Sequence, residues 1–232
     1  MTIITAKIKE IRQETPTVKV LKIDLQNQEF NYKAGQWIDC YADINGERPV
    51  VGYSLASSPS TKGYIELAVK TSDNPVTRFI HEKATEGDQL YIEGGQGEVF
   101  YEPGKDPKVV LAGAGIGVAP LMGILRYIDE ETDSSVQMFH SASSFDELIY
   151  FDELKERSKD NDRVSYYPTV SQEASVEDVD HGRITGTMFE RYDVDYGGVF
   201  YLSGPGEMIP DLKMFLVGKG VPLDRIRYEV WW

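Results

Sequence analysis

The chain has few of the side chains that bind metals or form covalent cross-links. It has one cysteine, Cys40, among its 232 residues, and three histidines, His81, His140 and His181. A single thiol excludes both an internal disulfide and an iron–sulfur cluster, because a cluster requires several cysteine ligands. The histidines show no metal-ligand spacing, so we expect no metal site.

Basic residues and long apolar stretches are also scarce. Lysine and arginine number 24 against 38 acidic residues, and the net charge of −14 argues against nucleic-acid binding. No stretch of sequence is apolar enough for a membrane helix, and residues 1–6 lack the basic start of a secretory signal. We therefore expect a cytoplasmic protein without a membrane span. The hydrophobic content of 41% predicts a folded core.

The first hundred residues alternate between apolar and polar side chains over short stretches. This period is typical of strands with one buried face, and it predicts an antiparallel barrel or sandwich. The expected strands cover residues 4–11, 18–25, 37–41, 50–56, 64–70 and 89–92. One helix interrupts them over Pro75–Lys83, where Asn74 is the expected N-cap and Pro75 takes the first helical position.

From Lys108 onward, apolar strands alternate with helices. This order predicts parallel strands joined by helical crossovers, as in a doubly wound sheet. Strands are expected at 109–112, 136–139, 164–169 and 199–202, and helices at 121–129, 145–157 and 208–218. Residues 102–107, rich in proline and glycine, form the expected boundary between the two halves. The acidic stretch 171–180 is expected to be an exposed loop.

Residues 108–120, KVVLAGAGIGVAP, are the most informative stretch. An apolar strand runs into a turn with Gly113, Gly115 and Gly117, and an apolar helix follows. Glycines let the backbone approach a phosphate, and free N–H groups of the first helical turn point at it. The usual fingerprint has a further glycine inside the helix, where this chain has Pro120, which suits a first helical turn. A nucleotide-phosphate site is therefore indicated; the alternative is a plain strand-to-helix turn.

Together with this turn, four motifs resemble those of the ferredoxin–NADP reductase superfamily of flavoenzymes in order and spacing. They are GQW at 35–37, GYSLAS at 52–57, YLSGPGEM at 201–208 and RYEVWW at 227–232. The resemblance implies a flavin-binding antiparallel Greek-key β-barrel over residues 1–103. It implies a doubly wound parallel-sheet domain that binds NAD(P) over residues 104–232. Within the family, the glycine before Tyr53 and the tryptophan-rich end resemble the branch of oxidoreductase NAD-binding domain-containing proteins.

The resemblance also implies roles at a flavin site. Tyr53 would stack on the isoalloxazine ring, and Ser54 would reach its N5 edge. Trp231 or Trp232 would cover the opposite face. The Thr77 hydroxyl and the N-terminus of its helix would hold flavin phosphates. The alternatives are that these aromatic residues only fill the core and that the helix only caps the barrel. Further candidate contacts are Val69, Lys70 and Arg78, and the alternative for the two charged residues is a solvated surface role.

The chain departs from the family pattern at two positions. Val51 stands where the family has an arginine that pairs with the flavin phosphate, and Arg48 is a candidate substitute from the preceding turn. The alternative for Arg48 is a solvated loop charge. Ser203 stands where the family often has a cysteine beside the nicotinamide. Serine keeps the small size and can donate a hydrogen bond, so we expect modified catalysis.

Candidate nucleotide contacts follow the strands of the second half. The implied set comprises Gly113, Gly115, Gly117, Pro120, Ser141, Gly204, Pro205 and Met208. For Gly204 and Pro205 the alternative is another strand-to-helix loop at the same sheet edge. Asp146 and Glu147 lie where family members that use NADPH commonly have an arginine, and these acids would repel a 2′-phosphate. NADH is therefore favoured. These residues also suit the start of a helix at Phe145, with Ser143 or Ser144 as its cap.

Taken together, the sequence predicts a flavin-dependent oxidoreductase. Hydride would move from NADH, or NADPH, to bound FAD, with FMN as the other possible flavin. Ser54, Ser203 and Glu229 are the predicted catalytic residues. Electrons would then pass to a separate acceptor, either a protein or a small molecule. The alternative is a non-catalytic or regulatory electron-transfer subunit on a reductase scaffold, with weak or no flavin binding.

Overall fold

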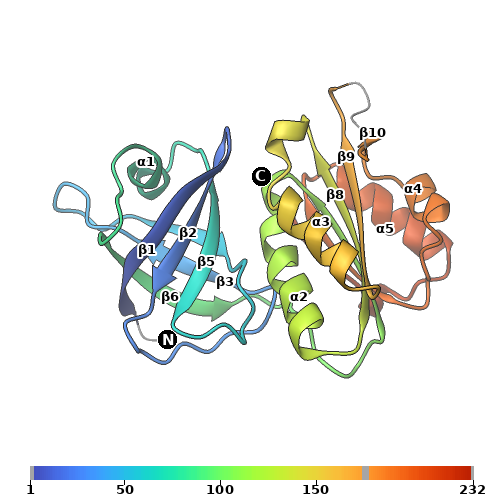
Figure 1. The fold of residues 1–232 in the computed structure, drawn as a ribbon, viewed down its shortest axis with the longest axis horizontal. Helices are drawn as coiled ribbons and strands as arrows, with labels where there is room; N and C mark the ends of the chain where they lie inside the picture. Colours follow the sequence, from blue (N-terminus) through green and yellow to red (C-terminus); the bar gives the residue numbers. More distant parts are fainter. Residues whose placement is uncertain (1–2, 174–177, 231–232) are drawn as a thin grey trace.

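The computed structural model describes residues 3–173 and 178–230, and it places one β-sheet in each half of the chain (Figure 1). The strands of the first sheet are β1 (Ile4–Thr15), β2 (Val18–Asp24), β3 (Trp37–Tyr41), β4 (Val50–Ser54), β5 (Tyr64–Lys70) and β6 (Gln89–Gln96). Neighbouring strands are antiparallel in the order β4-β3-β6-β1-β2-β5. A bridge between Leu55 and Leu67 joins the two ends of the sheet. The expected antiparallel barrel is therefore confirmed.

Helix α1 (Pro75–Glu82) closes one end of this barrel. The Asn74 side chain accepts a hydrogen bond from the Val76 N–H at 2.8 Å, as expected for an N-cap. Val76 and Ile80 are buried in the same apolar cluster as the inward side chains of the strands. The helix is thus anchored by its apolar face, and its N-terminus lies near the start of β4, where the Asn74 side chain donates to the Val50 carbonyl at 3.2 Å.

The second sheet is parallel and has helices on both faces. Its strands are β7 (Lys108–Ala114), β8 (Ser135–Ala142), β9 (Val164–Val170), β10 (Asp180–His181), β11 (Val199–Gly204) and β12 (Ile226–Val230). They are ordered β10-β9-β8-β7-β11-β12. Helices α2 (Val118–Glu131) and α3 (Phe151–Asp160) cover one face, and α4 (Gly186–Arg191) and α5 (Met208–Gly218) cover the other. The doubly wound prediction is confirmed.

Two local predictions in this half are wrong. Instead of one helix over 145–157, a short 3₁₀ turn at Phe145–Glu147 precedes α3, and Tyr150 between them has a left-handed backbone with φ of 58°. No serine caps that turn; the Phe145 N–H donates instead to the Glu173 carboxylate at 2.8 Å. Within 171–180, the described part is not all exposed loop, because β10 pairs with β9 and Val179 is buried.

The two halves share an apolar core. Outward-facing Val18, Val20 and Ala68 of the barrel belong to the same buried cluster as Leu121 and Leu125 of α2. Helix α2 thus lies between the parallel sheet and the barrel (Figure 1). In the described parts of the chain, no helix combines the length and apolar character needed to cross a membrane.

Candidate functional site

The glycine turn leads directly from β7 into α2. A 3₁₀ turn at Gly115–Gly117 connects them, and Gly115 has a positive φ of 55°, which favours glycine. A methyl group on Gly117 would lie 2.4 Å from the Ser203 carbonyl oxygen, so a larger residue cannot fit without displacing β11. Gly113 is equally tight, because its methyl group would lie 2.8 Å from the Leu121 side chain. The turn therefore needs its glycines for close packing as well as for conformation.

The second nucleotide motif lies beside this turn. Ser203 on β11 is opposite both Gly113 on β7 and Glu229 on β12. A methyl group on Gly204 would lie 3.0 Å from the Met208 side chain. The two motifs, ninety residues apart in sequence, therefore meet at the carboxyl edge of the sheet, where doubly wound proteins bind nucleotides.

A cleft of about 780 Å³ opens at this edge, between the parallel sheet and the barrel. Seven predicted cofactor-binding residues line it: Lys70, Gly115, Gly117, Ser141, Gly204, Pro205 and Met208. Gly113 and Pro120 are not among its lining residues; Pro120 is buried in the first turn of α2 and supports the turn from behind. The cleft also contains Arg183, which pairs with Glu207 at 3.3 Å. The sequence analysis did not select Arg183, because no local motif marks it.

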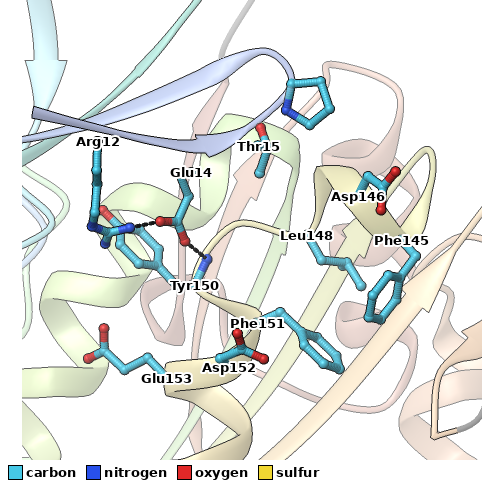
Figure 2. A pocket seen from close by; sticks show the side chains of 11 residues that line it. Arg12, Glu14, Thr15, Phe145, Asp146, Leu148, Tyr150, Phe151, Asp152 and Glu153 are labelled. Carbon is cyan, nitrogen blue, oxygen red and sulfur yellow. Dashed lines mark hydrogen bonds and ion pairs between the residues drawn. The ribbon is translucent and has the colours of Figure 1, made fainter.

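The two acidic residues that favoured NADH point to different cavities. Glu147 lines the nucleotide cleft and accepts hydrogen bonds from Thr15 at 3.1 Å and Thr17 at 2.6 Å. Asp146 lines a second cavity of about 580 Å³, between the β1–β2 hairpin and the segment leading into α3 (Figure 2). The expected repulsion of a 2′-phosphate therefore depends on Glu147.

The tyrosine of the flavin motif faces the barrel core. Tyr53 is 7% exposed, and its hydroxyl lies 2.7 Å from the Thr77 hydroxyl at the start of α1. Burial raises the pKa of Tyr53, so the hydroxyl stays protonated and can donate. Little of the ring is open to a stacking partner, so the predicted flat stacking on Tyr53 does not fit this geometry. Its hydroxyl edge and Thr77 remain candidates for contact with a phosphate.

The outer face of β4 carries Gly52 and Ser54, beside Trp37 of β3. Ser54 is opposite Trp37 in the sheet and is mostly buried. Methyl groups would lie 3.4 Å from the Trp37 ring if placed on Gly52 and 2.9 Å from it if placed on Gly97. The two glycines therefore leave room for the indole ring on this face of the barrel. Sequence reasoning used Trp37 only as a spacing marker and gave it no contact role.

Glu229 faces the barrel from the edge of the parallel sheet. The same methyl group on Gly97 would lie 3.5 Å from Glu229 Oε1, so the carboxyl lies near Trp37. Its buried Oε2 has no hydrogen-bond partner among the described residues. Burial raises the pKa of Glu229 to about 7. A carboxyl group that exchanges its proton near neutral pH thus lies between the two halves of the chain.

Two of the predicted flavin contacts are turned elsewhere. Arg48 donates to both carboxylate oxygens of Asp43, at 2.7 and 3.1 Å, and its guanidinium lies over the Tyr91 ring. This pairing within the β3–β4 hairpin makes it a poor substitute for an arginine at 51. The Val69 side chain is buried in the barrel core, and its carbonyl bonds to His81 at 2.9 Å. Trp231 and Trp232 lie outside the described residues.

Of the cationic candidates near the flavin motif, Lys70 is the one that lines the nucleotide cleft. Arg78 instead pairs with Asp73 at 2.6 Å on the surface. The described residues contain no cluster of acidic, histidine or cysteine side chains that could hold a metal ion. Cys40 is fully buried, and burial raises the pKa of its thiol to about 12, so it is not a reactive thiolate.

Comparison with known proteins agrees with this geometry. Residues 5–101 match the family described as Oxidoreductase FAD-binding domain, and residues 111–213 match Oxidoreductase NAD-binding domain. Oxidoreductase NAD-binding domain-containing protein 1 of Danio rerio is 30% identical over 256 residues, covering 100% of this chain and 93% of its own. The phenol hydroxylase P5 protein of Acinetobacter pittii is 30% identical over 213 residues, covering 88% and 58%.

Solved structures share the fold. The flavohem-like FAD/NAD-binding domain of nitric oxide dioxygenase from Vibrio cholerae superposes with a TM-score of 0.87 at 24% identity, over 98% of each chain. A ferredoxin NADP+ reductase from Neisseria gonorrhoeae, with FAD and NADP bound, gives 0.82 at 21% identity over 99% of each chain. With matched domains in the expected order and a relative matched along its length, the chain belongs to the ferredoxin–NADP reductase superfamily of FAD- and NAD(P)-binding oxidoreductases.

Proposed function

We propose that this chain is an NADH-dependent flavin oxidoreductase that passes electrons to a separate acceptor. The flavin, when bound, would take a hydride from the reduced nicotinamide and release its electrons singly or in pairs. The observation that carries the proposal is the meeting of two motif-bearing edges. Ser203 touches the glycine turn on one side, and Glu229, opposite it, faces the barrel near Trp37, which pairs with Ser54 in the barrel sheet.

The nucleotide half fits its ligand well. The turn at Gly115–Gly117 has no bulk that blocks a phosphate, and a methyl group on Gly115 would meet no atom within 4 Å. The N-terminus of α2 follows this turn, so its first N–H groups and the helix dipole favour an anion there. Pro205 and Met208 line the same cleft and would position the nicotinamide end.

The barrel residues proposed to bind the flavin offer little positive charge to its phosphates. The N-terminus of α1, the Thr77 hydroxyl and the Tyr53 hydroxyl are the groups proposed to face a flavin phosphate, and Lys70, which lines the cleft at the parallel sheet, is the proposed positive charge. Gly52, Ser54 and Trp37 offer a flat, partly apolar face of the kind an isoalloxazine ring requires. We propose residues 1–103 as the flavin-binding domain and 104–232 as the nucleotide-binding domain.

Three side chains are proposed to act on the reacting groups. The Ser54 hydroxyl would donate a hydrogen bond to the flavin edge, and the Ser203 hydroxyl would orient the nicotinamide. Glu229, whose pKa burial raises to about 7, would hold or release the proton that accompanies electron transfer. We propose NADH over NADPH because Glu147 lines the cleft and Glu207 already pairs with Arg183 there.

A separate protein is the proposed acceptor. Two similar structures are named as a cytochrome P450 reductase from Amycolatopsis and as the ferredoxin reductase in carbazole 1,9a-dioxygenase. A relative from Mycolicibacterium smegmatis is named as the reductase component of propane 2-monooxygenase. These names support an acceptor of the oxygenase type, with small molecules as the alternative.

A visible spectrum tests the proposal directly. We expect the purified protein, saturated with FAD, to show the oxidised flavin bands and to bleach when NADH is added without oxygen. NADPH should bleach it more slowly, and parallel titrations with FMN identify the preferred flavin. A protein that neither binds a flavin nor oxidises NADH would refute the proposal.

The second candidate is a non-catalytic subunit on the same scaffold. It is favoured by Val51 and by the pairing of Arg48 with Asp43, which leave the phosphate site short of a guanidinium. Such a subunit would bind NADH at the preformed turn but would not retain FAD. Separate binding isotherms for NADH and FAD therefore distinguish the two candidates.

A further inference from the structure

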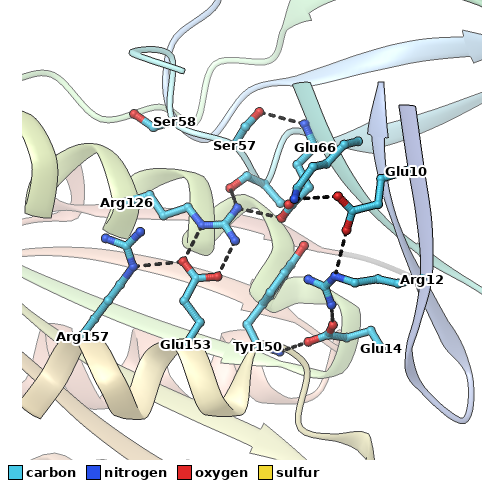
Figure 3. A network of polar contacts seen from close by, with 12 residues as sticks. Glu10, Arg12, Glu14, Ser57, Ser58, Glu66, Arg126, Tyr150, Glu153 and Arg157 are labelled. Carbon is cyan, nitrogen blue, oxygen red and sulfur yellow. Dashed lines mark hydrogen bonds and ion pairs between the residues drawn. The ribbon is translucent and has the colours of Figure 1, made fainter. Parts of the chain in front are cut away.

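Arg126 of α2 crosses from the nucleotide half to the barrel. Its Nη1 donates to the Ala56 carbonyl at 2.8 Å and to Glu66 Oε1 at 2.7 Å, both on the barrel (Figure 3). Its Nε and Nη2 donate to the two carboxylate oxygens of Glu153 on α3, at 2.8 and 2.5 Å. Only 11% of the Arg126 side chain is exposed, so water screens these contacts weakly.

The barrel segment that Arg126 holds is the last part of the flavin motif at residues 52–57. Ala56 is two residues beyond Ser54, and its N–H bonds to the Glu66 carbonyl at 2.9 Å. The next residue, Ser57, accepts a hydrogen bond from the Glu66 N–H at 3.0 Å, and its hydroxyl lies 2.8 Å from that of Tyr32. The segment is therefore held in place within the barrel by hydrogen bonds. A displacement of α2 would consequently shift Ser54 as well.

A glycine brings α2 into direct contact with the same segment. A methyl group on Gly123 would lie 2.5 Å from the Leu55 carbonyl oxygen and 3.1 Å from that of Ser57. The helix backbone thus packs on the barrel backbone with no side chain between them. Since α2 begins at Val118, directly after the glycine turn, one rigid helix joins the nucleotide turn to the flavin motif.

We propose that Arg126 is a positioning residue that fixes the spacing between the nucleotide turn and the flavin motif. It acts by tying α2 and α3 to the Ala56 carbonyl and to Glu66, while Gly123 sets the closest approach. The inference rests on the proposed function for its effect on hydride transfer. Its structural part, the coupling of the two halves, stands without it.

The same network supplies a matched control. Arg157 of α3 pairs with Glu153 at 2.9 Å, Asp129 at 2.5 Å and Glu130 at 3.2 Å, all within the nucleotide half. Arg157→Gln therefore removes a guanidinium from the network and leaves the crossing contacts in place. Arg126→Gln removes the crossing contacts, Arg126→Lys restores the charge without the forked geometry, and Gly123→Ala separates the two backbones by sterics alone.

The test combines calorimetry of the flavin-free chain with kinetics of the flavin-loaded one. For Arg126→Gln we expect the single unfolding transition of the wild type to split in two. We also expect flavin reduction in a single turnover to slow by about 10- to 100-fold, as small misplacements of reacting groups do. FAD and NADH affinities, measured separately, should change by less than about threefold, because Arg126 contacts none of the side chains proposed to bind either ligand, and the flavin-free spectrum should be unchanged. In Arg126→Gln, the long-wavelength charge-transfer band between flavin and nicotinamide should weaken. Arg126→Lys should recover part of the intensity of this band.

Each outcome decides the inference. If Arg126→Gln unfolds in one transition and reduces its flavin as fast as Arg157→Gln, Arg126 does not position the two halves. Equal slowing in both variants also overturns it, because the effect is then general to the network. If Arg126→Gln fails to fold, Arg126→Lys and Gly123→Ala give the same comparison. If the wild type is not reduced by NADH, the proposed function fails, and calorimetry alone decides whether Arg126 couples the two halves.

Discussion

The nucleotide site proposed in the parallel sheet and the flavin site proposed on the barrel differ in whether backbone or side-chain atoms would face the ligand. At the nucleotide site these atoms are backbone atoms: a turn of glycines pressed against the Ser203 carbonyl, followed by a helix N-terminus. At the proposed flavin site they are side chains, among them Tyr53, whose hydroxyl is hydrogen-bonded to Thr77, and Lys70, which lines the cleft. A site built from backbone atoms tolerates few substitutions, so it leaves a recognisable sequence motif. A site built from side chains can lack one of the usual residues, as at Val51, and still keep its overall geometry.

Adding one methyl group to the glycine turn tests this difference with the largest expected effect. Gly117→Ala would bring a carbon to 2.4 Å from the Ser203 carbonyl oxygen. We expect stability to fall by about 3 kcal/mol, as for overpacked cores. NADH affinity should fall about 100-fold, because the turn and β11 must separate. Thermal unfolding and NADH titration measure the two effects.

The control for this change is Gly218→Ala at the end of α5, where a methyl group meets no atom within 4 Å. It should leave NADH affinity unchanged and keep or raise stability. Normal NADH binding by Gly117→Ala would mean that the turn is not the nucleotide site.

The contrast is sharpened by adding a cation to the side-chain site. Val51→Arg restores the guanidinium on the inward face of β4, the face that carries Tyr53. We expect FAD affinity to rise about 10- to 100-fold, the contribution of about 1.5–3 kcal/mol from a charged hydrogen bond. Quenching of flavin fluorescence measures the affinity.

Val50→Arg is the matched control, because Val50 is the exposed neighbour on the same strand and points to the other face. Equal gains from both variants would indicate a nonspecific charge effect. No gain from Val51→Arg would contradict the prediction and mean that position 51 does not face a flavin phosphate.

Glu229 lies between the two proposed sites, and its raised pKa predicts that the stability of the chain depends on pH. Its pKa in the folded chain is about 7, against an ordinary value of 4.5. Because the folded pKa is raised, the stability linked to this group is fully present below pH 4.5 and is lost as pH rises through 7. Glu229→Gln removes this dependence, so the variant should be more stable than the wild type at pH 8.5 by about 1–2 kcal/mol, allowing for solvent screening.

Melting temperatures of the flavin-free proteins between pH 5 and 9 test this prediction. Glu98→Gln, at an exposed position, should follow the wild type at every pH. If the melting temperatures of Glu229→Gln and the wild type change with pH in the same way, a group other than Glu229 causes the pH dependence of stability.

The smallest expected effect separates packing from ligand contact at Tyr53. Tyr53→Phe removes the hydrogen bond to Thr77 and leaves a buried hydroxyl unpaired. We expect a stability loss of about 1 kcal/mol and FAD affinity about fivefold weaker. Tyr41→Phe, which loses a 3.2 Å bond to Glu93 on the barrel surface, is the control. A stability loss with unchanged FAD affinity would assign Tyr53 to the barrel core alone.

The sequence predicted the parts of the molecule that local patterns control. Alternating strands, the Asn74 cap and the glycine turn depend on neighbouring residues, and all appear in the structure. The sequence did not show that Arg48 pairs with Asp43 and lies over Tyr91, because these contacts form only when the hairpin folds. The helix expected over 145–157 is divided because a left-handed Tyr150 is buried against the core.

Contacts between the halves of the chain were beyond sequence reasoning. Trp37 meets Gly97, which comes sixty residues later, and Glu229 lies on the same side of Gly97. Arg126 reads as an ordinary polar residue of an amphipathic helix until the barrel segment is placed beside it. Such pairings depend on topology, and one chain without its fold carries no local signal of them.

The close packing of Gly123 on the Leu55 carbonyl has a consequence for protein engineering. In a chimera that joins the barrel of one relative to the nucleotide half of another, the backbone around Leu55 and the helix α2 that packs on it come from different proteins. A recipient with alanine at the position of Gly123, or with a displaced segment at the end of its flavin motif, would force the halves apart. Successful exchange therefore requires α2 and the barrel segment Leu55–Ser57 to be transplanted as a unit, even though they are far apart in the gene.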